Sequence, residues 1–481
     1  MSDFTDKLQQ LTKIIGPGHI KTDADAVATY AIDNMTPGAV IFPKDTTEIS
    51  KVVKFANQQK LAIVPWGSGS KIKAGNPPQQ LDLVVCTKRL NHMLDVDTQN
   101  LTITVEAGVK FRDIQARLAT QEDRCYLPIE DLTTEADEFV CSDRSNSGCF
   151  LPIDPTCSNT ATIGGVIAAN SSGPRRLLYN LPRDVILGVR FVTSKGDVPG
   201  SGGKTVKNVS GYDISKLMVG SMGSLGIITE MTFRLLPLPE KMQTVLLSFD
   251  SFSNAHAFTQ NVFETKLLPA AVDVMNAAAF KNIGLSNASN FSPEAYVVVI
   301  ALEAFEAAVD RMRFEMLAMA KANDVKDVAD FSEHEHLQFW LAVSDMAPRL
   351  DGRYSHLIRA KINYRISEWK DIFTFADKTL SENNIPHTIQ AHSGSGICVI
   401  NLLLDQAANA SIDKAVQFMD ELLKQSRKAG GNTVIQNAPS KVKSKLSVWG
   451  QTGSDFIAMK QLKERLDPNN VMSPGRFIGG L

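Results

Sequence analysis

The sequence predicts an α+β protein whose second half is built on an antiparallel sheet. Three observations lead to this class. Residues 39–65 read as a strand, a helix and a strand, and further strands follow up to residue 109. From residue 241 the pattern changes to a β-α-β-β-α series. A second series begins at LIRAKIN (357–363), and two such series are typical of a doubled, ferredoxin-like unit.

Composition and charge exclude several classes of protein. The chain has 481 residues, is 43% hydrophobic and carries a formal net charge of -2, so we expect a globular protein of several domains. No basic stripe indicates a nucleic acid or an anionic lipid as partner. No apolar run is long enough for a membrane span, and the start MSDFTDKLQQ is polar. These features predict a cytoplasmic protein, with attachment to the inner membrane through a partner subunit as the alternative.

The first half divides into short elements. A helix is expected over 4–15, and a threonine-capped helix is expected to begin near Thr46 or Thr47. Residues 121–160 have little periodicity and are rich in Asp, Ser, Pro and Cys, which predicts a loop. A glycine-punctuated helix and a strand hairpin follow, and Pro237 and Pro239 mark the end of this part.

The second half is more regular. Helices are expected over 253–266, 304–322, 366–382 and 409–429, with strands between them. A last helix, DFIAMKQLKERLD, is closed by a proline. These changes of pattern place the predicted domain boundaries so that the chain divides into residues 1–240, 241–445 and 446–481.

The stretch IVPWGSGSKIKAGN (63–76) predicts an anion site, because glycine N–H groups can approach a phosphate without an intervening Cβ. It is not the dinucleotide fingerprint G-x-G-x-x-G, since Ile72 stands at the third glycine position. VPGSGGKT (198–205) is not a P-loop, since Val198 stands where the first glycine belongs. Taken singly, each glycine run is better explained as a hairpin turn.

The order of these segments resembles the FAD-binding domain of the vanillyl-alcohol-oxidase-type (PCMH-type) flavoproteins. Among them, the FAD-binding subunits of glycolate oxidase and the related D-lactate dehydrogenases are most similar. The matching stretches include IVPWGSGSKIKAGNPP, LPIDPTCSNTATIGGVIAANSSG, GGKTVKNVSGYD and LDPNNVMSPGRFIGG. The resemblance implies an FAD-binding domain of two α+β subdomains over 1–240 and a substrate or cap domain over 241–445. The C-terminal segment would return to the FAD domain.

The resemblance also implies which residues hold FAD. The pyrophosphate loop would be Pro65, Trp66, Gly67, Ser68, Gly69 and Ser70. The diphosphate, ribityl chain and ring would lie along Pro155, Thr156, Thr162, Gly164, Gly165, Asn170, Ser171 and Gly173. The adenosine end would lie at Gly223, Gly226 and Ile228, with Arg476 in the C-terminal motif, where Ser473 replaces the asparagine of the family. Asn208 and Tyr212 either contact the flavin or brace the fold. No histidine lies in or near the loop, so non-covalent FAD is expected.

The expected chemistry is hydride transfer from a 2-hydroxy acid, which needs a cation for the carboxylate and a base for the hydroxyl proton. The candidates are His392, Arg359 and Lys361. The alternatives are a structural histidine and two solvated strand residues. Two departures from the lactate and 2-hydroxyglutarate branches stand out. Val399 occupies the place of their second metal-binding histidine, and Val343 that of the arginine in W-x-x-R. His334-Glu335-His336 is interpreted as a polar stretch before the helix that carries Trp340.

Four of the six cysteines lie in or beside an insertion at about 121–157 that relatives lack. They are Cys125, Cys141, Cys149 and Cys157, spaced 16, 8 and 8 residues apart. No C-x-x-C pair is present, so neither the zinc-ribbon nor the ferredoxin pattern applies. The cluster is either an iron–sulfur or zinc site or a set of free thiols on a partner-facing loop.

The sequence therefore leads to an FAD-dependent dehydrogenase of a small 2-hydroxy acid such as glycolate or D-lactate. Electrons would pass onward to an iron–sulfur partner subunit. The alternative is a non-catalytic, FAD-carrying accessory subunit of a similar complex, which the two valine departures favour.

Overall fold

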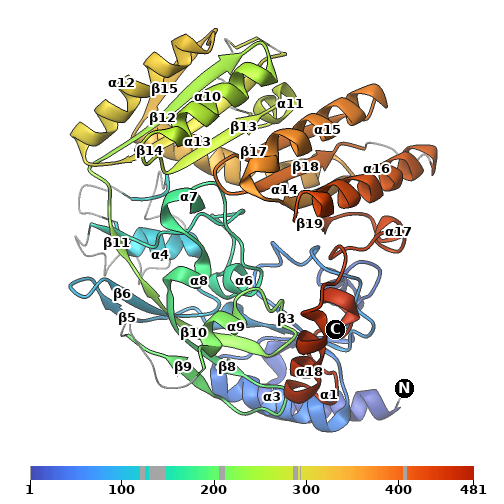
Figure 1. Cartoon of the computed structure of the whole chain (residues 1–481). Helices are drawn as coiled ribbons and strands as arrows, with labels where there is room; N and C mark the ends of the chain where they lie inside the picture. Colours follow the sequence, from blue (N-terminus) through green and yellow to red (C-terminus); the bar gives the residue numbers. More distant parts are fainter. Residues whose placement is uncertain are drawn as a thin grey trace.

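The computed structural model describes residues 2–119, 125–128, 148–204, 212–284, 291–292, 294–404 and 409–481. Two small sheets lie in one half of the molecule and a large sheet in the other, with the C-terminal segment running back to the small sheets (Figure 1). The α+β class predicted from the sequence is confirmed. Asn208 and Cys141 lie outside the described residues.

The N-terminal sheet has the strand order β1-β2-β4-β3 and mixes parallel and antiparallel pairs. Its strands are β1 (Ile20–Lys21), β2 (Ala39–Ile41), β3 (Ile63–Trp66) and β4 (Leu83–Cys86). Helices α1 (Ser2–Ile15) and α3 (Thr46–Gln59) pack on one face, and Val27 of α2 (Ala24–Ala28) packs with the strand residues of the opposite face. Asp45, not a threonine, caps α3, since its carboxylate accepts the N–H of Glu48 at 2.8 Å. The expected start is right and the expected capping residue is wrong.

The second sheet is antiparallel in the order β5-β6-β10-β8-β9. Its strands are β5 (Met93–Asp97), β6 (Thr102–Glu106), β8 (Ile186–Val192), β9 (Gly200–Gly202) and β10 (Ile227–Arg234), and β7 (Cys149–Phe150) pairs with β11 (Leu236–Pro237) beside them. The accompanying helices are α4 (Phe111–Arg117), α6 (Ile163–Ala168), α7 (Arg176–Tyr179), α8 (Pro182–Val185) and α9 (Ile214–Met218). Val192 and Ile227 of this sheet share one core cluster with α1 and α3, which joins the two small sheets.

The large antiparallel sheet has the order β15-β12-β14-β13-β17-β18-β16-β19. Its strands are β12 (Lys241–Phe249), β13 (Ala271–Met275), β14 (Tyr296–Ala304), β15 (Val328–Ser332), β16 (Ile358–Asn363), β17 (His387–His392), β18 (Ile397–Leu402) and β19 (Asn432–Asn437). Each predicted β-α-β-β-α series forms one half, and three residue pairs between β13 and β17 join the halves. The sheet begins at Lys241, where the predicted boundary falls; the domain limits stay a prediction.

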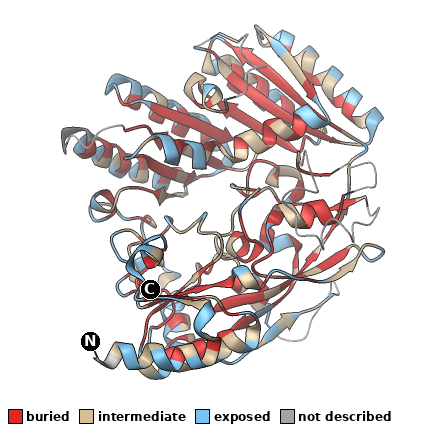
Figure 2. Ribbon diagram, turned by 180° about the vertical axis from the view of Figure 1, so that it is seen from behind, coloured by how far each residue is buried: buried red, intermediate tan, exposed pale blue. Residues whose placement is uncertain are grey.

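Four helices cover one face of the large sheet: α10 (Phe252–Glu264), α12 (Glu306–Ala322), α15 (Trp369–Glu382) and α16 (Asn409–Lys428). Alternation decides which side chains meet them, because successive residues of a strand point to opposite faces. Val298, Ile300 and Leu302 pack under the helices, whereas Glu303 belongs to the other face. The strands are buried on both faces over most of their length (Figure 2).

The other face of the large sheet is turned toward the small sheets and is partly covered by α11 (Ala277–Lys281), α13 (His334–Ser344) and α14 (Met346–Arg353). After β19 the chain forms α17 (Ser440–Lys443) and α18 (Phe456–Leu466). The C-terminal residues then extend the N-terminal sheet, since the N–H of Ile63 donates to Val471 at 2.7 Å and the N–H of Ser473 donates to Ile63 at 2.8 Å.

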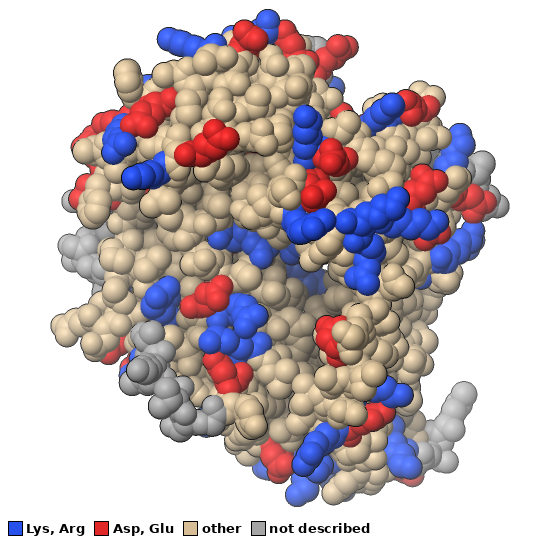
Figure 3. All heavy atoms as spheres, in the orientation of Figure 1, with Lys and Arg blue, Asp and Glu red and all other residues tan. Residues whose placement is uncertain are grey.

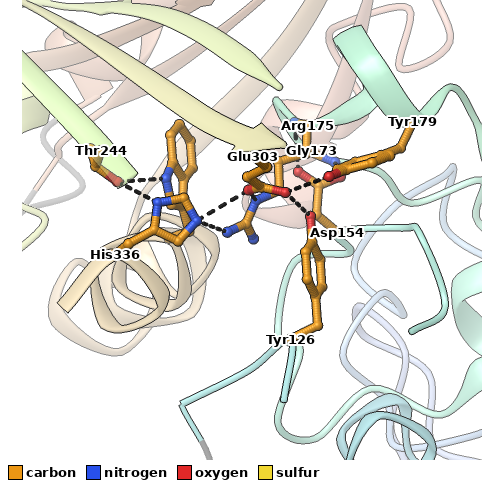
Figure 4. A network of polar contacts seen from close by, with 9 residues as sticks. Tyr126, Asp154, Gly173, Arg175, Tyr179, Thr244, Glu303 and His336 are labelled. Carbon is orange, nitrogen blue, oxygen red and sulfur yellow. Dashed lines mark hydrogen bonds and ion pairs between the residues drawn. The ribbon is translucent and has the colours of Figure 1, made fainter. Parts of the chain in front are cut away.

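Glu303 forms the centre of a buried polar network that joins the two halves of the molecule (Figure 4). Its Oε1 accepts from Arg175 Nε at 2.6 Å and lies 3.1 Å from His336 Nε2. Its Oε2 accepts the hydroxyls of Tyr126 at 2.9 Å and Tyr179 at 2.7 Å. Burial alone would raise the pKa of Glu303, but Arg175, His336 and Tyr179 outweigh it and lower that pKa to about 2.

A second part of the network orients His336. The indole of Trp340 donates to Thr244 Oγ1 at 3.0 Å, and this oxygen lies 2.9 Å from His336 Nδ1. Burial lowers the pKa of His336, so the ring is neutral. On the other side of the ring, Nε2 lies 3.1 Å from Glu303 Oε1 and 3.0 Å from Arg175 Nη2, which can only donate. His336 lies in the first turn of α13, and the expectation that it belongs to a polar stretch before this helix is wrong.

We expect Glu303→Gln to destabilise the protein by about 3–5 kcal/mol, because it leaves the buried Arg175 without its counter-charge. The measurement is urea unfolding of the FAD-loaded protein at pH 7. In the wild type, the contribution of Glu303 to stability is fully present above pH 4.5, the ordinary carboxyl pKa of the unfolded chain. It is lost as the pH falls toward about 2, the pKa of Glu303 in the folded protein.

The matched control is Glu315→Gln, which removes an exposed ion pair with Arg311 and should change stability by less than about 1 kcal/mol. Equal unfolding midpoints for the two variants would contradict the assignment of Glu303 as the central group.

Candidate functional site

Two adjoining cavities meet at the glycine-rich loop, one within the half that holds the small sheets and one between this half and the large sheet. The smaller, of about 100 Å³, follows the glycine-rich loop after β3. The larger, of about 1000 Å³, extends from this loop to the exposed face of the large sheet. Both are lined by residues 68–72, so they meet at the loop. Lys and Arg atoms are visible inside the hollow between the halves (Figure 3).

Most of the residues expected to hold the cofactor line these cavities. The smaller cavity is lined by Pro65, Trp66, Gly67, Ser68, Gly69, Ser70, Thr162, Gly164, Gly165, Gly223, Gly226, Ile228 and Arg476. The larger adds Thr156, Asn170, Ser171 and Gly173. Pro155 lines neither cavity, and its carbonyl accepts the hydroxyl of Ser158. Tyr212 also lines neither, and its side chain is 93% exposed.

Glycine is required in the loop for two reasons. A Cβ on Gly67 would lie 1.9 Å from Thr162 Oγ1, so a larger residue would displace Thr162. Gly69 has φ +81°, a conformation that L-residues rarely adopt, and it lies against the ring of Trp66. The N–H groups of Ser68, Gly69, Ser70 and Lys71 have no acceptor among the described residues. Four successive free N–H groups form an anion-binding concavity.

Two cations hold the far side of the loop. Arg476 Nη2 donates to the carbonyls of Ile72 and Ala74 at 2.7 Å each. Lys443 Nζ donates to the carbonyl of Lys73 at 2.7 Å and forms a buried ion pair with Asp33 at 2.8 Å. Three consecutive carbonyls are thereby bound, and the preceding N–H groups stay available to a ligand.

Several buried polar atoms along the cavities have no partner among the described residues. They are Thr162 Oγ1, Asn170 Oδ1, Ser172 Oγ and Arg476 Nη1. Buried polar groups are normally hydrogen-bonded, so this set fits a ligand rich in acceptors and donors. Together with the free N–H groups of the loop, it fits the expected dinucleotide cofactor.

A histidine–aspartate pair faces the larger cavity. Asp273 Oδ1 accepts from His392 Nδ1 at 2.8 Å, and its Oδ2 accepts the amide of Gln390 at 2.6 Å. A carboxylate only accepts, so the hydrogen of the ring lies on Nδ1. The lone pair of Nε2 has no partner among the described residues, and His392 lines the cavity. This arrangement is that of a general base with its orienting carboxylate.

Lys361 and Arg359 lie on the cavity face of β16, while Ile358, Ala360 and Ile362 face the helices. Burial lowers the pKa of Lys361 to about 8, helped by Arg176, and no carboxylate pairs with it among the described residues. Arg359 is bound instead, through Nε to Asn401 at 2.7 Å and through Nη2 to Asp351 at 2.8 Å. Of these two cations, Lys361 is therefore the one whose donors are left for a ligand.

The sequence analysis missed several charged residues of this region, among them Lys71, Arg175 and Asp154. Lys71 lines both cavities and donates to Thr156 Oγ1 and to its carbonyl at 2.6 Å. Asp154 accepts the N–H groups of Gly173 and Arg175 at 2.8 Å each, and burial raises its pKa to about 6. The position of Lys71 inside a glycine-rich loop could have indicated this residue, whereas no sequence pattern indicated Arg175.

The cysteines do not form a metal site in the part of the chain that the structure describes. Cys125 and Cys149 are buried in one apolar cluster, and Cys157 lines the larger cavity. No group of three metal-binding side chains occurs among the described residues. The proposed set also needs Cys141, which lies outside them, so an iron–sulfur or zinc site stays a prediction. No described helix combines the length and apolarity needed to cross a bilayer.

Comparisons with known proteins show which families the chain matches. Residues 37–128 and 143–199 match the family described as FAD binding domain. Residues 238–477 match the family described as FAD linked oxidases, C-terminal domain. Together the two matches span most of the chain, and they support FAD as the cofactor.

Two curated relatives match over nearly their full length. Glycolate oxidase subunit GlcD of Bacillus subtilis is 26% identical over 98% of this chain and 97% of its own. D-lactate dehydrogenase of Archaeoglobus fulgidus is 25% identical over 99% of both. Among solved structures, p-cresol methylhydroxylase superposes with a TM-score of 0.73 over 99% of this chain and 97% of that one, at 16% identity. The last likeness shows the PCMH-type fold alone.

We expect Gly67→Ala to weaken FAD binding about tenfold or more, because the added Cβ displaces Thr162 at the loop. The measurement is titration of the apoprotein with FAD. Gly203→Ala is the matched control, since a Cβ there meets nothing within 4 Å. Unchanged FAD affinity in the Gly67 variant would show that the loop does not hold the cofactor.

Proposed function

The chain belongs to the FAD-linked oxidases, and from that membership we propose that it dehydrogenates a small 2-hydroxy acid such as glycolate or D-lactate. The observation that carries the proposal is the His392–Asp273 pair at the wall of the larger cavity. The names of the relatives, a glycolate oxidase subunit and a D-lactate dehydrogenase, support the substrate class.

His392 would take the hydroxyl proton of the substrate at Nε2. Asp273 fixes the tautomer, and its second oxygen is held by Gln390, so the pair is oriented before substrate binds. Bound FAD supplies the acceptor for the hydride that leaves C2, and the product is the 2-oxo acid. Thr162, Gly67 and the free N–H groups of residues 68–71 would hold the cofactor.

Lys361 would bind the substrate carboxylate through its ammonium group, with Arg176 as a second cation at the cavity. Arg359 has a positioning role in this proposal, because its bonds to Asp351 and Asn401 fix β16 and β18.

The residues do not fit a divalent metal held by two histidines, since the second position carries the apolar Val399, which lines the cavity. We therefore assign the proton transfer to His392 alone.

One relative is named as a subunit of glycolate oxidase. By analogy we propose that an iron–sulfur partner subunit accepts the electrons. The runner-up is a non-catalytic, FAD-carrying accessory subunit. Val399 and Val343 favour it, since each stands where an active relative of the resembled branches has a functional side chain.

We expect glycolate or D-lactate to bleach the visible spectrum of the FAD-loaded protein under anaerobic conditions. His392→Gln should slow this reduction about 10²–10⁴-fold, because the general base is lost, and Asp273→Asn should slow it less. The oxidised flavin spectrum of each variant controls for cofactor binding. A wild-type flavin that stays oxidised with every 2-hydroxy acid would favour the accessory subunit.

The dependence of kcat/KM on pH should report Lys361. With a pKa of about 8 in the free protein, the ammonium is lost as pH rises through 8, and kcat/KM should fall there. Lys361→Arg should keep its charge and abolish this fall. Lys378→Arg, on the exposed side of α15, is the control. A fall at pH 8 that persists in the Lys361 variant would assign the titration to another group.

A further inference from the structure

The larger cavity is too large for a two- or three-carbon acid. Such an acid has five or six heavy atoms, roughly 150–180 Å³ at the ~30 Å³ that one water occupies in the liquid. The flavin ring system, with about eighteen heavy atoms, takes roughly 540 Å³ on the same scale. The larger cavity, of about 1000 Å³ and open to solvent on one side, therefore leaves room beside the ring for a longer substrate.

The space beyond Lys361 is lined by amide side chains with free polar atoms. Gln436 has no side-chain hydrogen bond among the described residues, and it lines the cavity. Asn437 donates to Asp351 at 2.9 Å, which leaves its oxygen free. An amide both donates and accepts, as a hydroxyl does, so a row of amides fits hydroxyl groups better than apolar or charged ones.

A β-bulge brings both amides to the cavity. The pairing of β16 with β19 is regular from Asn363 to Ala360 and then shifts, so that Gln436 is the additional residue opposite Arg359. In a regular strand Gln436 and Asn437 would point to opposite faces. Bulges frequently re-aim side chains beside active sites, and here both residues line the cavity.

These amides are out of reach of a short substrate. His392 lies on β17 and Gln436 on β19, with β18 and β16 between them. Three strand spacings of about 4.8 Å amount to roughly 14 Å across the sheet. The register makes Asn432 the residue of β19 that is level with His392, so Gln436 lies four residues, roughly 13 Å, further along the strand. The two offsets together separate His392 from Gln436 by roughly 19 Å. A two-carbon acid held against His392 cannot bridge this distance even with both side chains extended toward it, whereas a chain of four to six carbons can.

We infer that the substrate is a polyhydroxylated 2-hydroxy acid, an aldonic acid of four to six carbons, whose hydroxyl groups are bound by Gln436 and Asn437. This inference rests on the proposed function and names its substrate class. C2 of the acid lies at His392, its carboxylate at Lys361, and the hydroxylated tail extends along β19.

The test compares anaerobic flavin reduction by D-erythronate, D-gluconate and D-galactonate with that by 2-hydroxyhexanoate, which has a six-carbon chain and no tail hydroxyls. We expect kcat/KM for the best aldonate to exceed that for 2-hydroxyhexanoate about tenfold or more. Equal or better use of 2-hydroxyhexanoate or of D-2-hydroxyglutarate would overturn the inference.

Gln436→Leu should lower kcat/KM for the best aldonate about tenfold and leave that for D-lactate within about twofold. Gln260→Leu, an exposed position on α10, is the control for the same change elsewhere. Equal losses for the aldonate and D-lactate in the Gln436 variant would reduce that residue to a structural role and overturn the inference.

A binding measurement separates this inference from the proposed function. If no acid reduces the flavin, the proposed function is wrong, and the flavin difference spectrum on titration with D-gluconate decides the inference. Saturable binding that is weakened about tenfold in Gln436→Leu would support the hydroxyl subsite. Absence of aldonate binding in the wild type would overturn it.

Discussion

A single buried carboxylate fixes how the two halves of this molecule meet. Glu303 extends from the large sheet and accepts from Arg175, Tyr126 and Tyr179 of the other half, while Nε2 of His336, from its own half, lies 3.1 Å away. A buried charge is tolerated only when it is paired and hydrogen-bonded. The hydrogen bonds of Glu303 therefore set the position of the large sheet relative to the glycine-rich loop. The guanidinium of Arg175 is stacked between Tyr126 and Trp340, and these three residues also form a wall of the cavity.

The cofactor cradle follows a different logic, since it depends on groups that are left unbonded. Glycines keep the loop low against Thr162 and Trp66, and Arg476 and Lys443 hold its carbonyls from behind. The free N–H groups and the unpartnered hydroxyls then form a surface whose hydrogen bonds are completed by a ligand. Buried polar groups without partners are costly, so apolar packing alone does not account for such a surface.

Local patterns in the sequence predicted an anion site at the glycine-rich loop, and the family resemblance supplied the other residues expected to hold the cofactor. Neither indicated the contacts between residues that are distant in the sequence. The glycine-rich loop and the strand alternation of LIRAKIN are visible within a few residues, and both led to residues that line the cavities. His392 was found, but its partner Asp273 lies 119 residues away and had no local signal. The Glu303 network joins five segments, so neither periodicity nor spacing could indicate it. Arg359 was expected to bind substrate, yet its partner Asp351 could be seen only in the fold.

The join between the two halves of the large sheet has an evolutionary consequence. Only three residue pairs connect β13 with β17, and one of them is Asp273 with His392. The proposed base and its orienting carboxylate thus come from different β-α-β-β-α series and exist only where the series meet. If either series is exchanged for that of a homologue, the new residues must still form the contact between Asp273 and His392. The two halves are free to diverge in their helices and outer strands, but at the seam they must change together.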